Sequence, residues 1–299
     1  MPRPGSGAVV VGIDGSAAAV DAAVWAGAEA VRRTRPLRLV SVYALPEVAA
    51  PIQAGTYEQV RTGLAERAAG RLAEARAAVL ALYPDLEIVV AAREWGSVTA
   101  LVQESQRADL VALGSRGLGG FTGLQVGSTA VSVVARACCP IVVVRGRAPG
   151  AGPVVVGADG SSDSEAALGF ACEEARLLHT GLTVVHTWSD ILADGVLRPH
   201  PLQEDAAGIE QAERARLADQ VSGWQDKFPD LTIELDVSRG RPVRTLLERG
   251  EHAQLIVVGC RGRGGFTGML LGSTSQALIA HAPCPVAVVR PQDLSPHDR

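Results

Sequence analysis

The sequence predicts an α/β fold built from two tandem domains, each an open, mainly parallel five-stranded sheet with helices on both faces. Three observations predict it. Short apolar runs alternate with helical patterns along all 299 residues; the first half recurs in the second at an offset of 145 positions, as from Gly114 to Gly259; and residues 145–153, RGRAPGAGP, have the composition of a linker. We therefore expect one domain over residues 1–148 and another over residues 149–299.

Each expected element follows from a local pattern: strands from β-branched apolar runs, and helices from apolar residues at helical spacing or long Ala/Arg/Glu/Leu stretches. The first half is predicted as strand 8–13, helix 18–33, strand 37–44, helix 57–82, strand 87–92, a short helix from Ser97, strand 109–114, a helix opening near Ser128 and strand 140–145. The second half repeats this order as a strand opening at Val154, helix 164–178, strand 182–189, helix 202–228, strand 233–238, a short helix from Pro242, strand 254–259, a helix opening near Ser273 and strand 285–290.

Composition argues against several classes of protein. A net charge of −4 and a pI near 5.9 argue against a nucleic-acid partner. No apolar run reaches the roughly 18 residues that a membrane span needs. The five cysteines show no disulfide or metal-binding spacing, and Cys139 and Cys284 occupy equivalent positions before a proline. We expect a cytoplasmic protein with no structural metal.

A glycine-rich stretch occurs twice, as GSRGLGGFTGLQVGST at 114–129 and as GCRGRGGFTGMLLGST at 259–274. Each copy follows a buried strand and opens a helix, whose unpaired N–H groups and positive dipole end suit an anion. Glycines allow close approach of backbone to a ligand. The stretch is not a Walker loop, because the only lysine is Lys227, and no GxGxxG follows the first strand. It predicts a phosphate cradle.

A second repeated feature ends the first strand of each half, as Asp14-Gly15-Ser16 and again from Asp159. Parallel sheets bind ligands outside the carboxyl ends of strands, where the winding direction reverses. If the first and fourth strands are neighbours there, the aspartate and the glycine stretch face one crevice. A pocket with an acid at one end and a phosphate cradle at the other suits a nucleotide.

These motifs resemble the universal stress proteins, specifically their ATP-binding subfamily in tandem-domain form, over the whole chain apart from short tails. The spacing Gly-x2-Gly-x9-Gly-Ser is met twice, at Gly114, Gly117 and Gly127-Ser128 and at Gly259, Gly262 and Gly272-Ser273. The resemblance implies an adenine nucleotide alpha-hydrolase-like, Rossmann-like fold. It also implies ATP as the ligand, one molecule per half, with Mg²⁺ as an optional companion ion.

The resemblance places the adenine near the aspartates and the backbone after the second strand, and the ribose and phosphates along the glycine stretch. Asp190 is an acid of the variable loop that could lend a metal contact. The residues expected to bind the nucleotide are Gly12, Asp14, Val42, Gly114, Ser115, Arg116, Gly117, Leu118, Gly119, Gly120, Gly127, Ser128 and Thr129 in the first half and Gly157, Asp159, Thr187, Asp190, Gly259, Cys260, Arg261, Gly262, Arg263, Gly264, Gly265, Gly272, Ser273 and Thr274 in the second.

Simpler roles compete at several of these positions. The two aspartates could be turn or N-cap residues, and Ser128 and Ser273 could be N-caps. Arg116 and Arg261 could neutralise phosphate or lie in solvent. Cys260 could sense redox state, but its counterpart is a serine, which favours a tolerated small residue.

Three functions remain open: an ATP-binding regulatory switch in stress response, an ATP-consuming enzyme, and a scaffold that does not need nucleotide. No Asp or Glu lies between Asp109 and Asp159, or between Glu251 and Asp293. Phosphoryl transfer usually relies on carboxylates that hold Mg²⁺ and orient the nucleophile. We therefore expect a switch with no or very slow ATP hydrolysis and no catalytic residues. We also expect a homodimer and a downstream protein partner that the sequence does not identify.

Overall fold

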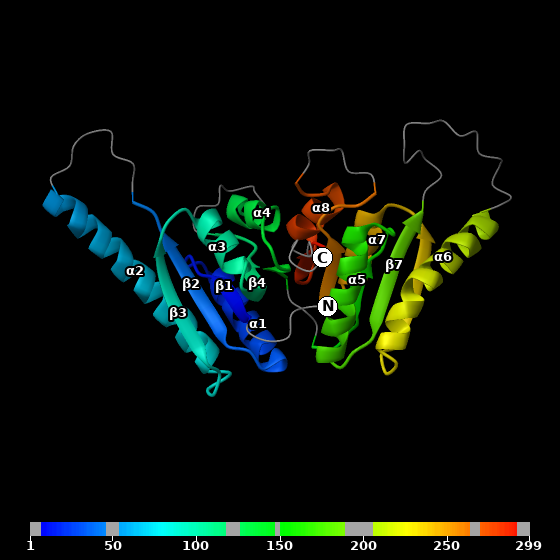
Figure 1. Ribbon diagram of the computed structural model, residues 1–299, viewed down its shortest axis with the longest axis horizontal. Helices are drawn as coiled ribbons and strands as arrows, with labels where there is room; N and C mark the ends of the chain where they lie inside the picture. The colour runs from blue at the N-terminus through cyan, green and yellow to red at the C-terminus, as the bar shows by residue number, and fades with distance from the viewer. Residues whose placement is uncertain are drawn as a thin grey trace, which may run out of the picture. The chain divides into compact units, whose positions relative to one another are not determined.

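The computed structural model describes residues 7–45, 54–117, 126–146, 150–188, 206–263 and 270–291, and its ribbon is drawn in Figure 1. The chain divides into two compact units, Met1–Arg145 and Gly146–Arg299. In the described ranges, no helix combines the length and the apolar character that crossing a membrane requires.

The first unit is a five-stranded parallel sheet in the order β3-β2-β1-β4-β5. α1 and α2 pack against one face, and α3 and α4 pack against the other (Figure 1). Its elements are β1 (Ala8–Gly12), α1 (Ala17–Arg33), β2 (Leu37–Tyr43), α2 (Ala54–Leu80), β3 (Ile88–Glu94), α3 (Ser97–Ser105), β4 (Ala108–Gly114), α4 (Ser128–Val134) and β5 (Ile141–Val144).

The second unit repeats this architecture in the order β10-β9-β6-β7-β8, again with parallel pairs. Its elements are β6 (Val154–Gly157), α5 (Ser162–Leu177), β7 (Leu182–Trp188), α6 (Ala206–Lys227), β8 (Ile233–Arg239), α7 (Pro242–Gly250), β9 (Leu255–Gly259), α8 (Ser273–His281) and β10 (Val286–Val289). The predicted fold class is confirmed. The expected first turn of the helix at 202–228 lies outside the described residues.

The central strands read as continuous apolar runs because helices cover both faces of each sheet. Val9, Val10 and Val11 of β1 are at most 1% exposed, as are Val154 and Val156 of β6. The sequence pattern of an all-buried strand therefore follows from the parallel, doubly covered architecture.

Helices α1 and α5 lie unusually close to the ends of β4 and β9. A Cβ built on Gly114 would lie 2.7 Å from the backbone of Ala18 in α1, and one on Gly259 would lie 2.8 Å from the backbone of Asp163 in α5. No side chain fits such gaps, so the first glycine of each repeated stretch sets the distance between helix and strand.

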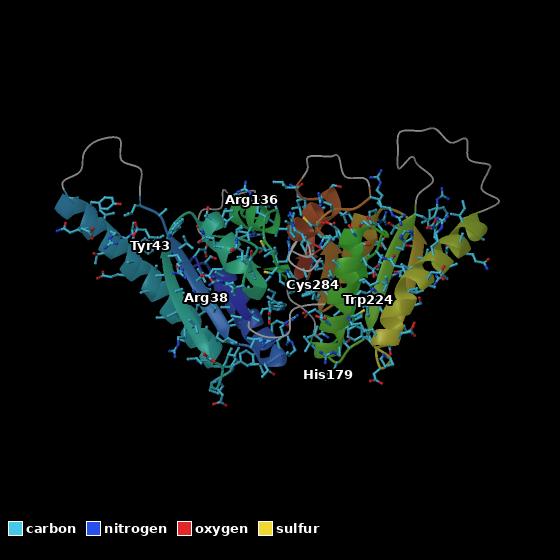
Figure 2. The ribbon with its side chains drawn as sticks, viewed as in Figure 1. Arg38, Tyr43, Arg136, His179, Trp224 and Cys284 are labelled. Carbon is cyan, nitrogen blue, oxygen red and sulfur yellow. The ribbon has the colours of Figure 1, made fainter. Side chains whose placement is uncertain are left out.

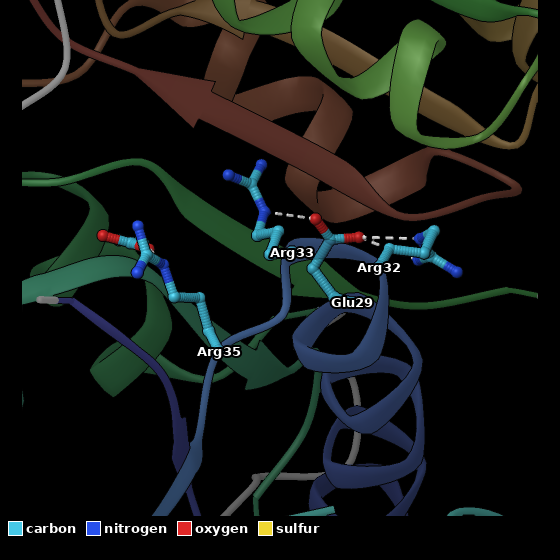
Figure 3. Close-up of polar contacts among 5 residues, drawn as sticks. Glu29, Arg32, Arg33 and Arg35 are labelled. Atoms are coloured by element: carbon cyan, nitrogen blue, oxygen red, sulfur yellow. Dashed lines mark hydrogen bonds and ion pairs between the residues drawn. The ribbon is translucent and has the colours of Figure 1, made fainter. Parts of the chain in front are cut away.

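The C-terminal end of α1 carries a buried acid. Glu29 is fully buried and accepts hydrogen bonds from the guanidinium groups of Arg32 and Arg33, while the neighbouring Arg35 binds Asp109 of β4 at 2.9 Å (Figure 3). Cations in the last turn also favour the helix dipole. These bonds satisfy a carboxylate that would otherwise be costly to bury.

In the second unit, Trp224 joins α6 to α5 (Figure 2). A Cβ on Gly169 of α5 would lie 2.5 Å from the Trp224 ring, so glycine makes room for the indole. The ring nitrogen donates to Glu165 at 2.6 Å. The position equivalent to Trp224 in the first half is Val79.

Candidate functional site

The first aspartate turn lies at the carboxyl end of β1. The backbone N–H of Ser16 donates to Asp14 Oδ1 at 2.9 Å, and Gly15 takes a φ of +91°. Ser16 itself is the N-cap of α1, because its hydroxyl accepts from the N–H of Ala19 at 3.2 Å. Asp14 is therefore a turn residue, and the alternative that it caps the helix is wrong.

The second half builds the same turn with a further serine. Ser161 N–H donates to Asp159 Oδ1 at 2.9 Å, and Ser161 caps α5. In addition, the hydroxyl of Ser164 accepts from the N–H of Gly160 at 3.1 Å. Ala19 occupies the position equivalent to Ser164, so the first turn lacks this hydroxyl, but there the Ser16 hydroxyl donates to Asp14 Oδ1 at 2.7 Å and lies 3.1 Å from the Arg116 carbonyl.

The other carboxylate oxygen faces the glycine stretch in both halves. A Cβ on Gly117 would lie 2.5 Å from Asp14 Oδ2, and one on Gly262 would lie 2.5 Å from Asp159 Oδ2. In the second half Asp159 Oδ2 also accepts the N–H of Arg263 at 2.9 Å. Since β1 pairs with β4 and β6 with β9, the structure brings aspartate and glycines together where the winding reverses.

Hydrogen bonding keeps the Asp159 carboxyl ionised. Burial alone would raise its pKa, but bonds from Ser161 and the backbone N–H of Arg263 hold the pKa below its ordinary value. The second unit therefore presents a fixed negative charge at one end of the crevice.

The helices that open the phosphate side begin at glycine. Gly127 is the N-cap of α4 and Gly272 is the N-cap of α8, both with extended backbone. Ser128 and Ser273 are the first helical residues, so the N-cap role expected as an alternative for them is wrong. Glycine has no side chain to offer as a cap, so it leaves the N–H groups of the first turn open to another acceptor.

The glycines of the crevice differ in what surrounds them. A Cβ on Gly12 would meet Leu113 at 2.9 Å, and one on Gly157 would meet Leu246 at 3.2 Å, so both make room for packed leucines. Among the described residues, a Cβ on Gly127 would meet nothing closer than the Gly117 nitrogen at 3.8 Å. The described residues thus leave room for a methyl group at Gly127.

A backbone hydrogen bond links the two ends of each glycine stretch. The N–H of Gly127 donates to the Ser115 carbonyl at 3.0 Å, and the N–H of Gly272 donates to the Cys260 carbonyl at 2.8 Å. The second stretch has another anchor, since Asp163 of α5 accepts the N–H of Arg261 at 2.9 Å.

The arginines of the stretch take different positions. The Arg116 residue is exposed. The Arg261 side chain lies 3.8 Å from the Asp163 carboxylate. Arg263 folds back over the aspartate turn, because a Cβ on Gly160 would lie 1.9 Å from its Nη2. Arg261 and Arg263 therefore do not form one paired cation cluster.

A cavity of about 420 Å³ opens beside Asp159 and Arg263. The polar wall of this cavity was not predicted from the sequence: Glu213 of α6 binds Arg216 at 2.7 Å and lies 3.3 Å from His186 of β7. The lining residues are Asp159, Gly160, Ser161, Ser162, Glu165, His186, Glu213, Arg216, Leu217, Gln220 and Arg263. A signal existed in the offset of 145, because the first half has Val20, Ser41, Ala68 and Ala75 at the positions of Glu165, His186, Glu213 and Gln220.

Cys260 packs inside the second unit. It is fully buried, and its thiol donates to the Leu270 carbonyl at 3.2 Å. Burial raises the pKa of the thiol despite the nearby Arg290. Since the thiolate is the reactive form, this environment favours packing over redox sensing.

The remaining expected residues fall into two groups. Val42 and Thr187 lie at the carboxyl ends of β2 and β7, and Ser128, Thr129, Ser273 and Thr274 lie in the first turns of α4 and α8. Leu118, Gly119, Gly120, Asp190, Gly264 and Gly265 lie outside the described residues. Across the ranges that are described, no group of three or more His, Cys, Asp or Glu is placed to hold a metal ion.

Known proteins are similar to this chain over nearly its whole length. The model of the universal stress protein family matches residues 6–145 and 151–290. A universal stress protein of Mycolicibacterium smegmatis is 36% identical over 293 residues, covering 95% of this chain and 97% of that protein. One of Mycobacterium tuberculosis is 37% identical over 300 residues, covering 97% and 98%. The crystal structure of a universal stress protein from Archaeoglobus fulgidus superposes with a TM-score of 0.69 at 20% identity, covering 95% of this chain and 98% of that one.

Proposed function

This chain belongs to the universal stress protein family, and we propose that each half binds one ATP and that the protein acts as a nucleotide-dependent regulatory switch in a stress response. One observation carries the proposal. In each half, a helix that opens on the crevice begins at a glycine, while the neighbouring helix is capped by Ser16 or Ser161. The N–H groups left open at the glycine suit phosphate oxygens.

The other end of the crevice supports the same ligand. Asp14 and Asp159 are fixed by turn and loop hydrogen bonds, so each presents a positioned acceptor for a polar edge such as that of adenine. In the second half the adjoining cavity of about 420 Å³ falls within the usual range of small-molecule sites, about 300–1,000 Å³.

We propose that ATP is held with no or very slow hydrolysis. The stretches that would surround the phosphates carry no carboxylate from residue 110 to residue 158 or from residue 252 to residue 292. Turnover should therefore stay well below about 1 per second, the low end of typical enzymes. A faster rate that one acid-to-amide substitution removes would favour the enzyme.

Occupancy of such a site reports the ATP level, and a switch passes that state to another protein. We therefore include a downstream protein partner and a homodimer in the proposal. Neither depends on a catalytic step.

The substitution Gly127→Ala tests the phosphate cradle. Among the described residues the methyl group meets only the Gly117 nitrogen, at 3.8 Å, so the fold should tolerate it, whereas a phosphate drawn against the helix start should not. We expect calorimetric titration to fall from two ATP per chain to one, with an unchanged melting temperature.

Gly70→Ala is the matched control, because its methyl group, on the exposed side of α2, meets no described atom within 4 Å. It should leave two ATP per chain. Full stoichiometry in Gly127→Ala would show that phosphate does not approach this residue. A wild-type chain that releases no nucleotide on acid treatment and takes up none would overturn the function.

A further inference from the structure

The two units end in edge strands that occupy equivalent positions but differ in chemistry. Within the described part of the chain, β3 pairs with β2 and β8 pairs with β7, and each strand is the last of its sheet on that side. An edge strand presents a row of N–H and C=O groups that another strand can bind. The two edges show how one chain treats the same exposed backbone in two ways.

The β8 edge is guarded. Arg214 of α6 donates to the carbonyl oxygen of Leu235, at the centre of the strand, at 3.0 Å. Glu234 and Asp236 flank Leu235, and Asp236 binds Arg249 at 2.6 Å. An occupied central carbonyl and two charges are typical devices against strand pairing.

Among the described residues, no side chain donates to an outward carbonyl of β3, and the positions equivalent to Glu234 and Asp236 carry no charge. Val89 and Val90 are 40% and 48% exposed, in a run of five uncharged residues, Ile88–Ala92. The three charged residues at the β8 edge have uncharged counterparts in the first half: Val89 for Glu234, Ala91 for Asp236 and Ala69 for Arg214. An exposed apolar edge of this kind is suited to pairing.

The backbone direction of β3 limits how a second strand can pair with it. Leu37 N–H donates to the Glu87 carbonyl, and Trp95 N–H donates to the Tyr43 carbonyl, so odd-numbered residues of this strand face β2. Peptide groups alternate along a strand, and therefore those of the even-numbered residues, with Val90 at the centre, point outward.

An antiparallel second copy centred on Val90 satisfies these groups. Val90 then pairs with the partner's Val90, and Ile88 pairs with the partner's Ala92, all through outward peptide groups. In this register Glu87 lies opposite the partner's Arg93, at non-hydrogen-bonded positions where side chains come closest. Two-fold symmetry makes this charge pair twice.

The same register on β8 would fail, because Glu234 would lie opposite the partner's Asp236. Like charges directly opposite each other destabilise a strand pair. On β3, the Arg93 side chain is 48% exposed, and its 3.3 Å contact with Glu104 leaves it able to reach a second acid.

We propose that a second copy of this chain docks on β3, antiparallel and centred on Val90, so that the sheets of two first units join edge to edge. This inference rests on the homodimer included in the proposed function and names its surface. It does not depend on nucleotide binding.

Transferring the β8 charges to β3 tests the surface. The wild type should sediment with twice its mass of 31.0 kDa, and Val89→Glu with Ala91→Asp should raise the dimer dissociation constant at least about 100-fold. Glu234→Lys changes the matched position on β8 and should leave the dimer intact. A wild type that is monomeric at every concentration would overturn both the homodimer and this surface. A dimer that ignores the β3 charges would overturn the surface alone.

A charge swap tests the register. Glu87→Arg alone and Arg93→Glu alone should each weaken the dimer by about tenfold, and the double variant should recover most of the loss. Hydrogen exchange on the unmodified chain adds a second measurement, since the Val90 amide should gain protection as concentration rises. Failure of the double variant to recover, together with an unprotected Val90 amide, would rule out this pairing.

Discussion

The candidate sites of the two halves have the same main-chain geometry but different surrounding side chains. Both place a glycine 2.5 Å, counted from its built Cβ, from an aspartate oxygen, and both begin the helix after the stretch at a glycine. The positions beside the second aspartate carry Glu165, His186, Glu213 and Gln220, where the first half has Val20, Ser41, Ala68 and Ala75. Backbone geometry that positions a ligand was retained, whereas its surroundings diverged, so the two sites should accept one ligand class with different strengths.

The side chains also differ between the halves on the sheet face that α3 covers in the first unit and α7 covers in the second. In the first unit Glu104 of α3 accepts two bonds from Arg38 of β2, at 2.8 and 3.0 Å. Burial would raise the Glu104 pKa, but Arg38 and Arg93 hold it below its ordinary value. In the second unit the signs are reversed, since Arg249 of α7 binds Asp236 of β8. The fold fixes where the short helix packs, and either polarity can hold it there.

After the loss of one site expected for Gly127→Ala, the largest expected effect comes from changing a contact that both halves share. Gly117→Ala and Gly262→Ala would each push a methyl group to 2.5 Å from the aspartate Oδ2 of their own half. Displacing a charged hydrogen-bond acceptor costs about 1.5–3 kcal/mol, so ATP affinity should fall roughly ten- to a hundredfold in that half alone. Calorimetric titration measures this, and the unaltered half of each variant is the control. Equal loss in both halves would contradict separate sites.

A smaller effect should distinguish the halves. Arg263 adds a cation beside the second aspartate turn, where the first half has Leu118. A partly exposed charge-assisted contact from Arg263 to an acceptor atom of the nucleotide contributes about 1 kcal/mol, so the second site should bind ATP roughly fivefold more tightly. Arg263→Leu should remove the difference in ATP affinity by weakening the second site. Leu118→Arg should reduce the difference by strengthening the first site. Salt should narrow the gap, because exposed charges are screened within about 10 Å at 0.1 M. A tighter first site would contradict this role.

The hydrogen bond between Asp163 and the second glycine stretch should contribute a similar or smaller amount to ATP affinity at the second site. Asp163 is buried and accepts the N–H of Arg261 at 2.9 Å, and its counterpart is Ala18. Asp163→Ala should lower the melting temperature and weaken the second site by about fivefold, since the loop loses about 1 kcal/mol of hydrogen bonding. Ala18→Asp is the reciprocal change, and thermal unfolding of both variants measures the anchor. No change in either would show that the loop is held by other contacts.

The smallest effect concerns pH. The folded-state pKa of Asp159 lies below the ordinary value of 3.8, so its ionised form stabilises the fold. For a lowered pKa this stability is fully present well above pH 3.8 and is lost as pH falls through the folded-state value. The wild type should therefore melt above Asp159→Asn near neutral pH, and the difference should shrink below about pH 4. A gap that grows in acid would contradict the sign.

Sequence reasoning predicted the architecture because its causes are local or repeated. Apolar runs, turn residues and the offset of 145 predicted the strands along the chain. The crevice between Asp14 and the glycine stretch was predicted only on the condition that the first and fourth strands are neighbours, which the sheet order shows for β1 and β4. It could not say which atoms the glycines avoid. Gly12 makes room for leucines and Gly117 makes room for a carboxylate, but the sequence shows only a glycine at both positions.

The polar wall of the second cavity escaped prediction for another reason. Glu213 and Arg216 sit in a long helix with charges of both signs, a pattern typical of a solvated face. The Glu213 side chain is only 19% exposed because of how α6 lies against β7 and α5, which is a tertiary property, whereas the Arg216 side chain is 74% exposed. Likewise, the direction of Arg263 is set by the Gly160 turn, which lies about a hundred positions earlier in the chain.

The close approach at Gly114 and Gly259 also bears on how the gene tolerates change. Every substitution there adds at least a methyl group against helix backbone, so a screen for folded protein alone should already reject nearly all variants. The Gly127→Ala variant should pass the screen for folded protein and should be rejected only by a second screen that selects for nucleotide retention. Two screens of one mutant library would therefore divide a single glycine motif into residues that the fold demands and residues that the ligand demands.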